Sequence, residues 1–189
     1  MRKDLMMSTR ILVAYATWAG STTGVAETIS QTLREAGADA AVRPVAAVDD
    51  LTGYDALVLG AAVHAGKPHP ALRHFVERHA TDLNTMPVAY FVVCATMMED
   101  TPEHRETVLT YLTPLRAIKE PVSIGLFAGA YNPKTVNVLF RWLAKLMRAP
   151  EGDWRDWEAI RAWATDLAPL MMQPGPVATP MGAEAPSPL

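Results

Sequence analysis

The chain has 189 residues, of which 50% are hydrophobic and 20% are charged, and its formal net charge is −3. This length fits roughly one domain of about 150 residues, and the composition is that of a globular protein, which excludes wholesale disorder. The single cysteine excludes an intramolecular disulfide. Because the chain is mildly negative, it lacks the positive field of a nucleic-acid-binding protein, and we expect no nucleic-acid partner.

The first predicted unit is a strand, a loop and a helix. Residues 10–16 (RILVAYA) form a short apolar run, and the small and polar residues 17–22 follow it. Val25, Ile29 and Leu33 then recur at helical spacing.

The same alternation continues along the chain. Further strands are predicted at 40–45, 56–63, 88–95 and 122–130, and further helices at 70–80, 103–117, 134–148 and 154–171. The strands are continuously apolar, which is typical of a parallel sheet covered by helices on both faces. The sequence therefore predicts a doubly wound α/β fold with five parallel strands. Ligands of such sheets bind outside the carboxyl ends of the strands, so the informative loops follow Ala16, Val63, Ala95 and Ala130.

The loop after the first strand has the composition of a phosphate site. Thr17, Ser21 and Thr22 offer hydroxyl groups, Gly20 allows close approach of the backbone, and the following helix begins with free N–H groups. A phosphate monoester can bind there without a lysine. The loop glycine is either Gly20, in T-W-A-G-S-T, or Gly24, in S-T-T-G, and the first alignment is preferred because it begins directly after the strand. A simple Ser/Thr-rich helix cap is the alternative.

The segment T-W-A-G-S-T resembles the flavodoxin phosphate loop, with Ala19 where that pattern has a threonine. The second loop, H-A-G-K after the run Y-D-A-L-V-L-G-A-A-V, resembles the menaquinone-dependent protoporphyrinogen dehydrogenase branch of the flavodoxin-like superfamily. The resemblance covers about residues 8–171 and implies a flavodoxin-like sheet with strand order 2-1-3-4-5. It also implies non-covalently bound FMN, with contacts expected from Thr17, Trp18, Ala19, Gly20, Ser21, Thr22, Ala62, Val63, His64, Ala65, Gly66, Ala95, Thr96, Met97 and Met98.

Members of that family pass electrons from protoporphyrinogen through FMN to a membrane quinone, in haem biosynthesis. The resemblance therefore implies an FMN-dependent oxidoreductase with a porphyrinogen and a quinone as partners. Electron-carrier flavodoxins place aromatic rings against the flavin from the second and third loops, and this sequence has no Phe, Tyr or Trp in either. That difference favours a flavin face open to a flat substrate, and we expect the tetrapyrrole near His64, Met97 and Tyr131.

Residues 134–148 are predicted to form a basic amphipathic helix, with Arg141, Lys145 and Arg148 along one side. This helix either packs on the sheet with its cations solvated or lies against an anionic membrane surface, where a quinone is reached. The same family has an insertion here with a similar helix, followed by D-W, which Asp156 and Trp157 match.

Membrane-spanning and secretory segments are not expected. The longest apolar run, 86–98, is shorter than the roughly 20 residues of a membrane helix, and the apolar stretch at 5–7 is too short for a signal-peptide core. We expect a cytoplasmic protein. In the second of the two interpretations of the helix at 134–148, that helix is peripheral on the inner face of the cell membrane.

Other chemistry has little support in the sequence. His69, His74 and His79 are five residues apart, so they cannot share one helix face, and no metal site is expected. Cys94 lies in an apolar run and is expected to be a buried structural thiol. No G-x-S-x-G follows a strand, so a hydrolase triad is not predicted. Lys67 and His69 either face a substrate carboxylate or lie in solvent.

Two further functions stay open. The first is a flavodoxin-type electron carrier that docks on a redox partner and has no substrate of its own, and the second is an interaction domain that has lost FMN. Flavodoxin-like quinone reductases would share the loop and the fold.

Residues 173–189 hold five of the 15 prolines and no aromatic residue, so we expect a disordered, Pro-rich tail. The sequence predicts neither a catalytic acid or base nor an oligomeric state.

Overall fold

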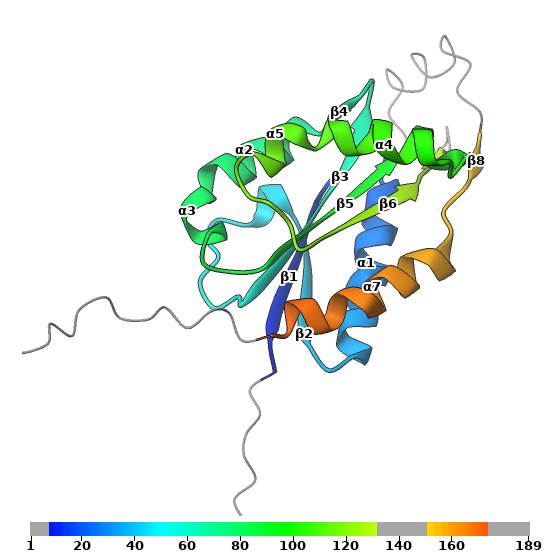
Figure 1. The fold of residues 1–189 in the computed structure, drawn as a ribbon. Helices are drawn as coiled ribbons and strands as arrows, with labels where there is room; N and C mark the ends of the chain where they lie inside the picture. Colours follow the sequence, from blue (N-terminus) through cyan, green and yellow to red (C-terminus); the bar gives the residue numbers. More distant parts are fainter. Residues whose placement is uncertain (1–7, 132–150, 174–189) are drawn as a thin grey trace, which may run out of the picture.

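The computed structural model describes residues 8–131 and 151–173. Their main sheet has five parallel strands in the order β2-β1-β3-β5-β6, which confirms the predicted order and the doubly wound class (Figure 1). A short strand, β4, pairs antiparallel with β3 and was not predicted. The strands are β1 (Arg10–Ala16), β2 (Asp39–Pro44), β3 (Ala56–His64), β4 (Lys67–Pro68), β5 (Val88–Cys94) and β6 (Ser123–Ala128).

Helices cover both faces of the sheet (Figure 1). One face carries α1 (Ser21–Glu35) and α7 (Trp157–Met171), which pack against each other. The other face carries α2 (Pro70–Arg78), α3 (Ala80–Leu83), α4 (Pro102–Tyr111) and α5 (Thr113–Arg116). Successive strand residues point to opposite faces, so β1 supplies Ile11 and Val13 to one core and Leu12 and Ala14 to the other. Strand β5, which lies between β3 and β6, is buried along its whole length.

The last helix begins three residues later than the predicted boundary at 154. Asp156 is its N-cap, and Oδ1 of that side chain accepts hydrogen bonds from the backbone N–H groups of Glu158 and Ala159. The residues before the cap form β8 (Gly152–Asp153), which pairs antiparallel with β7 (Ala130–Tyr131). This pair places Tyr131 beside Gly152, on either side of residues 132–150.

Two predicted features lie outside the described residues. These are the basic amphipathic helix at 134–148 and nearly all of the Pro-rich tail at 173–189. Among the helices of the described ranges, none combines the length and the apolar character needed to cross a membrane.

Candidate functional site

The loops that follow β1, β3, β5 and β6 meet at the carboxyl edge of the sheet, as the topology predicts (Figure 1). Side chains bridge them. Trp18, from the first loop, contacts His64 at the end of β3. A Cβ built at Gly129, which follows β6, would lie 3.6 Å from Oγ of Ser21 in the first turn of α1. The first loop therefore lies against both the second loop and the segment that follows β6.

The loop between β1 and α1 makes a tight turn at Gly20, whose φ of 84° is in the left-handed region. The N–H group of Gly20 donates to Oγ1 of Thr17 at 3.0 Å, which closes the loop. Helix α1 then begins at Ser21 with no side-chain cap and no acidic residue in its first turn. The positive end of α1 is thus left open to an anion.

Thr22 places a buried hydroxyl group in this loop. The residue is fully buried in the first turn of α1, and its Oγ1 atom has no hydrogen-bond partner among the described residues. A buried hydroxyl without a partner costs roughly 1–3 kcal/mol. A phosphate oxygen bound at the helix end would satisfy it, so the residues of this loop fit the phosphate that the sequence predicts there.

The structure also separates the two alignments of the loop. Gly20 occupies the turn, whereas Gly24 lies inside α1, where a Cβ would meet Nη1 of Arg155 at 3.0 Å and the Trp157 ring at 3.4 Å. The glycine of the turn between β1 and α1 is therefore Gly20.

The second loop is a hairpin rather than an open connection. β3 continues to His64, turns at Ala65 and Gly66, which both have positive φ, and returns as β4. A Cβ at Gly66 would lie 3.3 Å from the ring of Tyr111, so the tip of the hairpin rests on α4. Ala62, Val63 and His64 are half-buried and Ala65 is exposed.

Trp18 forms an aromatic group with two histidines of the hairpin segment. Its ring centroid lies 4.4 Å from that of His69 and 5.7 Å from that of His64, and 41% of the tryptophan surface is exposed. The sequence places Trp18 in the phosphate loop but gives no sign of these contacts, because they join two segments far apart in the chain. An exposed planar surface therefore exists beside the second loop, supplied by the first.

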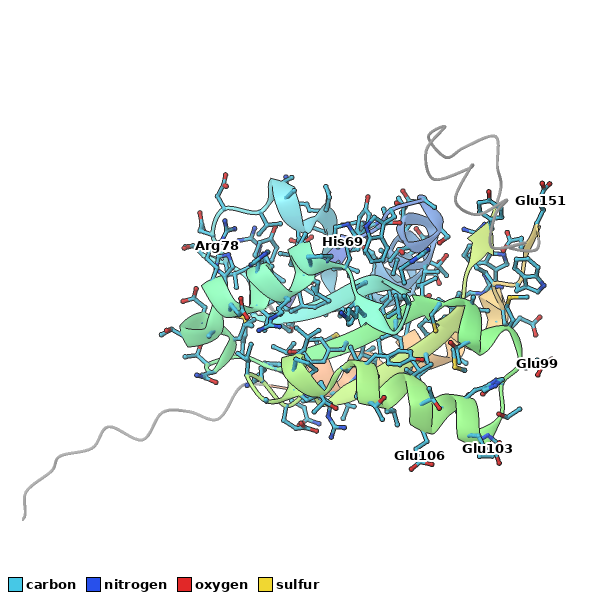
Figure 2. All side chains as sticks on the ribbon, turned by 90° about the horizontal axis from the view of Figure 1, so that it is seen from above. His69, Arg78, Glu99, Glu103, Glu106 and Glu151 are labelled. Carbon is cyan, nitrogen blue, oxygen red and sulfur yellow. The ribbon has the colours of Figure 1, made fainter. Side chains whose placement is uncertain are left out.

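His69 is the residue of this group that lies at the start of α2 (Figure 2). Its Nδ1 atom accepts a hydrogen bond from the backbone N–H of Ala71 at 3.2 Å, which caps α2. Burial lowers the pKa of His69, because the charged imidazolium is desolvated. The ring is therefore neutral at pH 7, with its proton on Nε2.

The third loop is a short 3₁₀ helix, η2 (Ala95–Met98). Ala95 is exposed, and Thr96 and Met98 are half-buried, so they are accessible at the edge. The side chain of Met97 packs into the core instead, with 5% of its surface exposed. Only the backbone of Met97 can take part in a site here. Cys94 is also buried, and burial raises the pKa of its thiol.

Arg155 lies beside the first turn of α1, a position that sequence reasoning missed. It lies between β8 and α7, pairs with Asp153, and places its guanidinium 4.5 Å from the centre of the Trp157 ring. Its Nη1 atom lies 3.5 Å from the carbonyl oxygen of Ser21 in the first turn of α1. The D-W motif marks this segment in the sequence, but the contact spans 134 positions and no local pattern announces it.

Comparisons with known proteins agree with this geometry. The family model described as Flavodoxin domain matches residues 12–157. A protoporphyrinogen IX dehydrogenase [quinone] of Escherichia coli K12 is 28% identical over 179 residues, which cover 87% of this chain and 98% of that protein. A protein of the same name from Leishmania major is 29% identical over 189 residues, covering 90% of this chain and 80% of its own.

Solved structures give the same fold. A flavodoxin from Streptococcus pneumoniae TIGR4 superposes with a TM-score of 0.56 at 17% identity, covering 85% of this chain and 99% of its own. A flavodoxin from the domain Archaea has a TM-score of 0.55 at 16% identity, covering 86% of this chain and 98% of its own.

Proposed function

Because this chain belongs to the Flavodoxin domain family, we propose that it binds FMN at the carboxyl edge of its sheet and acts as an oxidoreductase. In this proposal, a reduced organic substrate of the protoporphyrinogen class gives electrons to the flavin, and a quinone accepts them. The substrate and acceptor classes come from the names of the relatives in Escherichia coli and Leishmania major.

One observation carries the proposal. The buried hydroxyl of Thr22 has no partner among the described residues, and it lies in the first turn of a helix whose N-terminus has no acidic residue and no side-chain cap. A phosphate monoester supplies both the negative charge and the hydrogen-bonding oxygens that this arrangement lacks. FMN has that group at the end of its ribityl chain.

We place the isoalloxazine ring between the second and third loops. Backbone groups of the hairpin and of η2 would contact the ring, through Ala62, Val63, His64, Ala65, Gly66, Ala95, Thr96, Met97 and Met98. The ribityl phosphate would then occupy the first loop, Thr17 to Thr22. The bound flavin supplies the two-electron chemistry, whereas the chain binds it, orients it and shapes the space beside it.

The surroundings of the ring favour a flat partner. Trp18 packs against His64 and His69 next to the hairpin and keeps 41% of its surface exposed, and aromatic rings of this kind stack on planar ligands. A tetrapyrrole or a quinone bound over the flavin would lie near His64 and Tyr131. The packing of Met97 in the core removes its side chain from this proposed contact.

An acidic surface gives some support to a second function, that of an electron carrier. Glu99, Glu103 and Glu106 are exposed and project from the segment around the start of α4, beside the third loop (Figure 2). Such a surface would attract a basic redox partner. A carrier would transfer electrons only to that partner protein, whereas the dehydrogenase would reduce a quinone alone.

The visible absorption spectrum of the purified protein, with the flavin released and identified, tests the cofactor. Protoporphyrinogen oxidation is then followed in the presence and absence of menaquinone. We expect one FMN per chain and quinone-dependent turnover without a partner protein. Apoprotein that fails to take up added FMN would refute the proposal, and a flavoprotein that is oxidised only by a partner protein would favour the carrier.

The variant Thr22→Val tests the phosphate loop. It removes the hydroxyl while keeping the shape of the side chain, and we expect it to weaken FMN binding by about tenfold, the equivalent of one charge-assisted hydrogen bond. Thr28→Val is the matched control, because Thr28 lies on the same helix and its hydroxyl already bonds the Gly24 carbonyl. Equal FMN affinities of Thr22→Val and the parent chain would exclude this loop as the phosphate site.

A further inference from the structure

We propose that Arg155, a cation outside the phosphate loop, makes this site selective for a dianionic phosphate monoester, so that the chain distinguishes FMN from riboflavin by charge. This inference rests on the FMN site proposed above. It differs from the expectation drawn from the loop sequence alone, in which hydroxyl and N–H groups suffice and no cation is needed.

Arg155 is held in one orientation by three groups. Its Nε and Nη2 atoms donate to the two carboxylate oxygens of Asp153 at 2.8 and 2.5 Å, and the guanidinium plane lies over the Trp157 ring. This leaves Nη1 as the edge that faces α1, where it lies 3.5 Å from the Ser21 carbonyl oxygen. A guanidinium fixed in this way presents a charge to a ligand without losing side-chain entropy on binding.

The guanidinium adds a full positive charge beside the end of α1 that already carries a partial positive charge. Nη1 reaches the first turn of α1 through the hydrogen bond that it donates to the Ser21 carbonyl oxygen. Asp153 offsets part of the charge of Arg155, and 48% of the Asp153 side chain is exposed, against 19% for Arg155. A phosphate dianion bound at this helix end would be attracted by both the helix and the guanidinium.

Gly24 provides the space that Arg155 occupies. A Cβ at this position would lie 3.0 Å from Nη1 of Arg155 and 3.4 Å from the Trp157 ring. A glycine inside a helix costs about 1 kcal/mol relative to alanine. Helix α1 thus contains a destabilising residue at the point where the guanidinium docks, which is expected if the docking serves binding rather than helix stability.

The test compares two ligands that differ only in the phosphate. Dissociation constants of FMN and riboflavin are measured by fluorescence titration of the full-length apoprotein and its variants at low ionic strength. For Arg155→Gln we expect FMN to bind about fivefold more weakly, while the riboflavin affinity is unchanged, because the loss is one partly screened charge. Arg161→Gln is the matched control, since Arg161 is exposed further along α7 and its replacement changes the net charge equally.

Two more variants separate charge from structural support. Arg155→Lys keeps the charge and should keep most of the preference for FMN over riboflavin. Asp153→Asn removes the counter-charge and should keep or increase that preference. If the ion pair of Arg155 with Asp153 only supported the structure, Asp153→Asn would lower the preference as much as Arg155→Gln does. The riboflavin affinity reports folding in every variant.

The possible results have distinct meanings. An unchanged ratio of FMN to riboflavin affinity in Arg155→Gln overturns the role of Arg155 alone and leaves the proposed function standing. Equal losses of this ratio in Arg155→Gln, Arg155→Lys and Asp153→Asn also overturn the role of its charge. A parent chain that binds neither flavin overturns the proposed function together with this inference.

Discussion

The imidazole of His69 links pH to stability at the scale of a single residue. Burial lowers its pKa below the ordinary value of 6.5, so the unfolded chain binds a proton more readily than the folded one. The stabilisation is present above that value and is lost as the pH falls through it. We expect the unfolding free energy of the chain to drop on acidification below about pH 6.5, partly because of this residue.

The variant His69→Asn isolates this contribution. Asparagine can still accept the hydrogen bond from the Ala71 N–H group, so the cap of α2 is kept while the titration is removed. Urea unfolding between pH 5 and 8 should show a smaller loss of stability in the variant. His74→Asn is the control, because His74 is exposed on the same helix. A profile of His69→Asn that matches the parent would contradict the argument.

Thr22 and Arg155 show what sequence reasoning can find at this scale. Thr22 was identified because it belongs to a local motif, with the strand, the turn and the helix start all within a few residues. The burial of its hydroxyl and the absence of a partner within the described residues are tertiary facts and could not be predicted. Arg155 was missed because its contact with α1 depends on how α7 packs, which no local pattern records.

At the scale of the element, the N-terminus of α7 depends on one side chain. Asp156→Ala removes the acceptor for two backbone N–H groups, so we expect a loss of about 1 kcal/mol of unfolding free energy. Urea denaturation measures it. Asp156→Asn should lose much less, since the amide oxygen still caps the helix, and Asp166→Ala is a control for the lost charge at an exposed position of α7. A loss in Asp156→Asn equal to that in Asp156→Ala would argue against the cap.

The strands were predicted more accurately than the ends of the helices. Continuous apolar runs such as 88–95 identify buried parallel strands directly, because both faces of the sheet exclude water. The predicted start of α7 is three residues early, because the end of the preceding segment is set by the pairing of β8 with β7 and not by the local sequence. This pairing joins segments on either side of residues 132–150. The hairpin at Ala65 and Gly66 was missed for a similar reason, because its tip rests on α4.

At the scale of the whole molecule, FMN binding should stabilise the fold. A ligand at one hundred times its dissociation constant adds about 2.7 kcal/mol, which for a domain of this size corresponds to a rise in Tm of roughly 5 to 10 °C. Thermal unfolding followed by circular dichroism measures the shift. The rise should be smaller for Thr22→Val at the same FMN concentration and unchanged for Thr28→Val. A Tm that does not respond to FMN in the parent chain would contradict the proposed site.

The overall architecture followed from the sequence because the alternation of apolar strands and amphipathic helices admits few topologies. The sequence predicts the arrangement of the loops at the carboxyl edge less completely. The topology predicts which four loops meet there, but the contact of Trp18 with His64 and His69 depends on side-chain directions that are set only in the folded chain.

The pairing of Tyr131 with Gly152 has a consequence for how this fold can be altered. Because these two residues are neighbours, we expect that residues 132–150 can be exchanged for a sequence of another length without shifting β6 or α7. Tyr131 and Gly152 are therefore suitable junctions for exchanging this segment between homologous chains while the sheet and the edge proposed to bind FMN are kept.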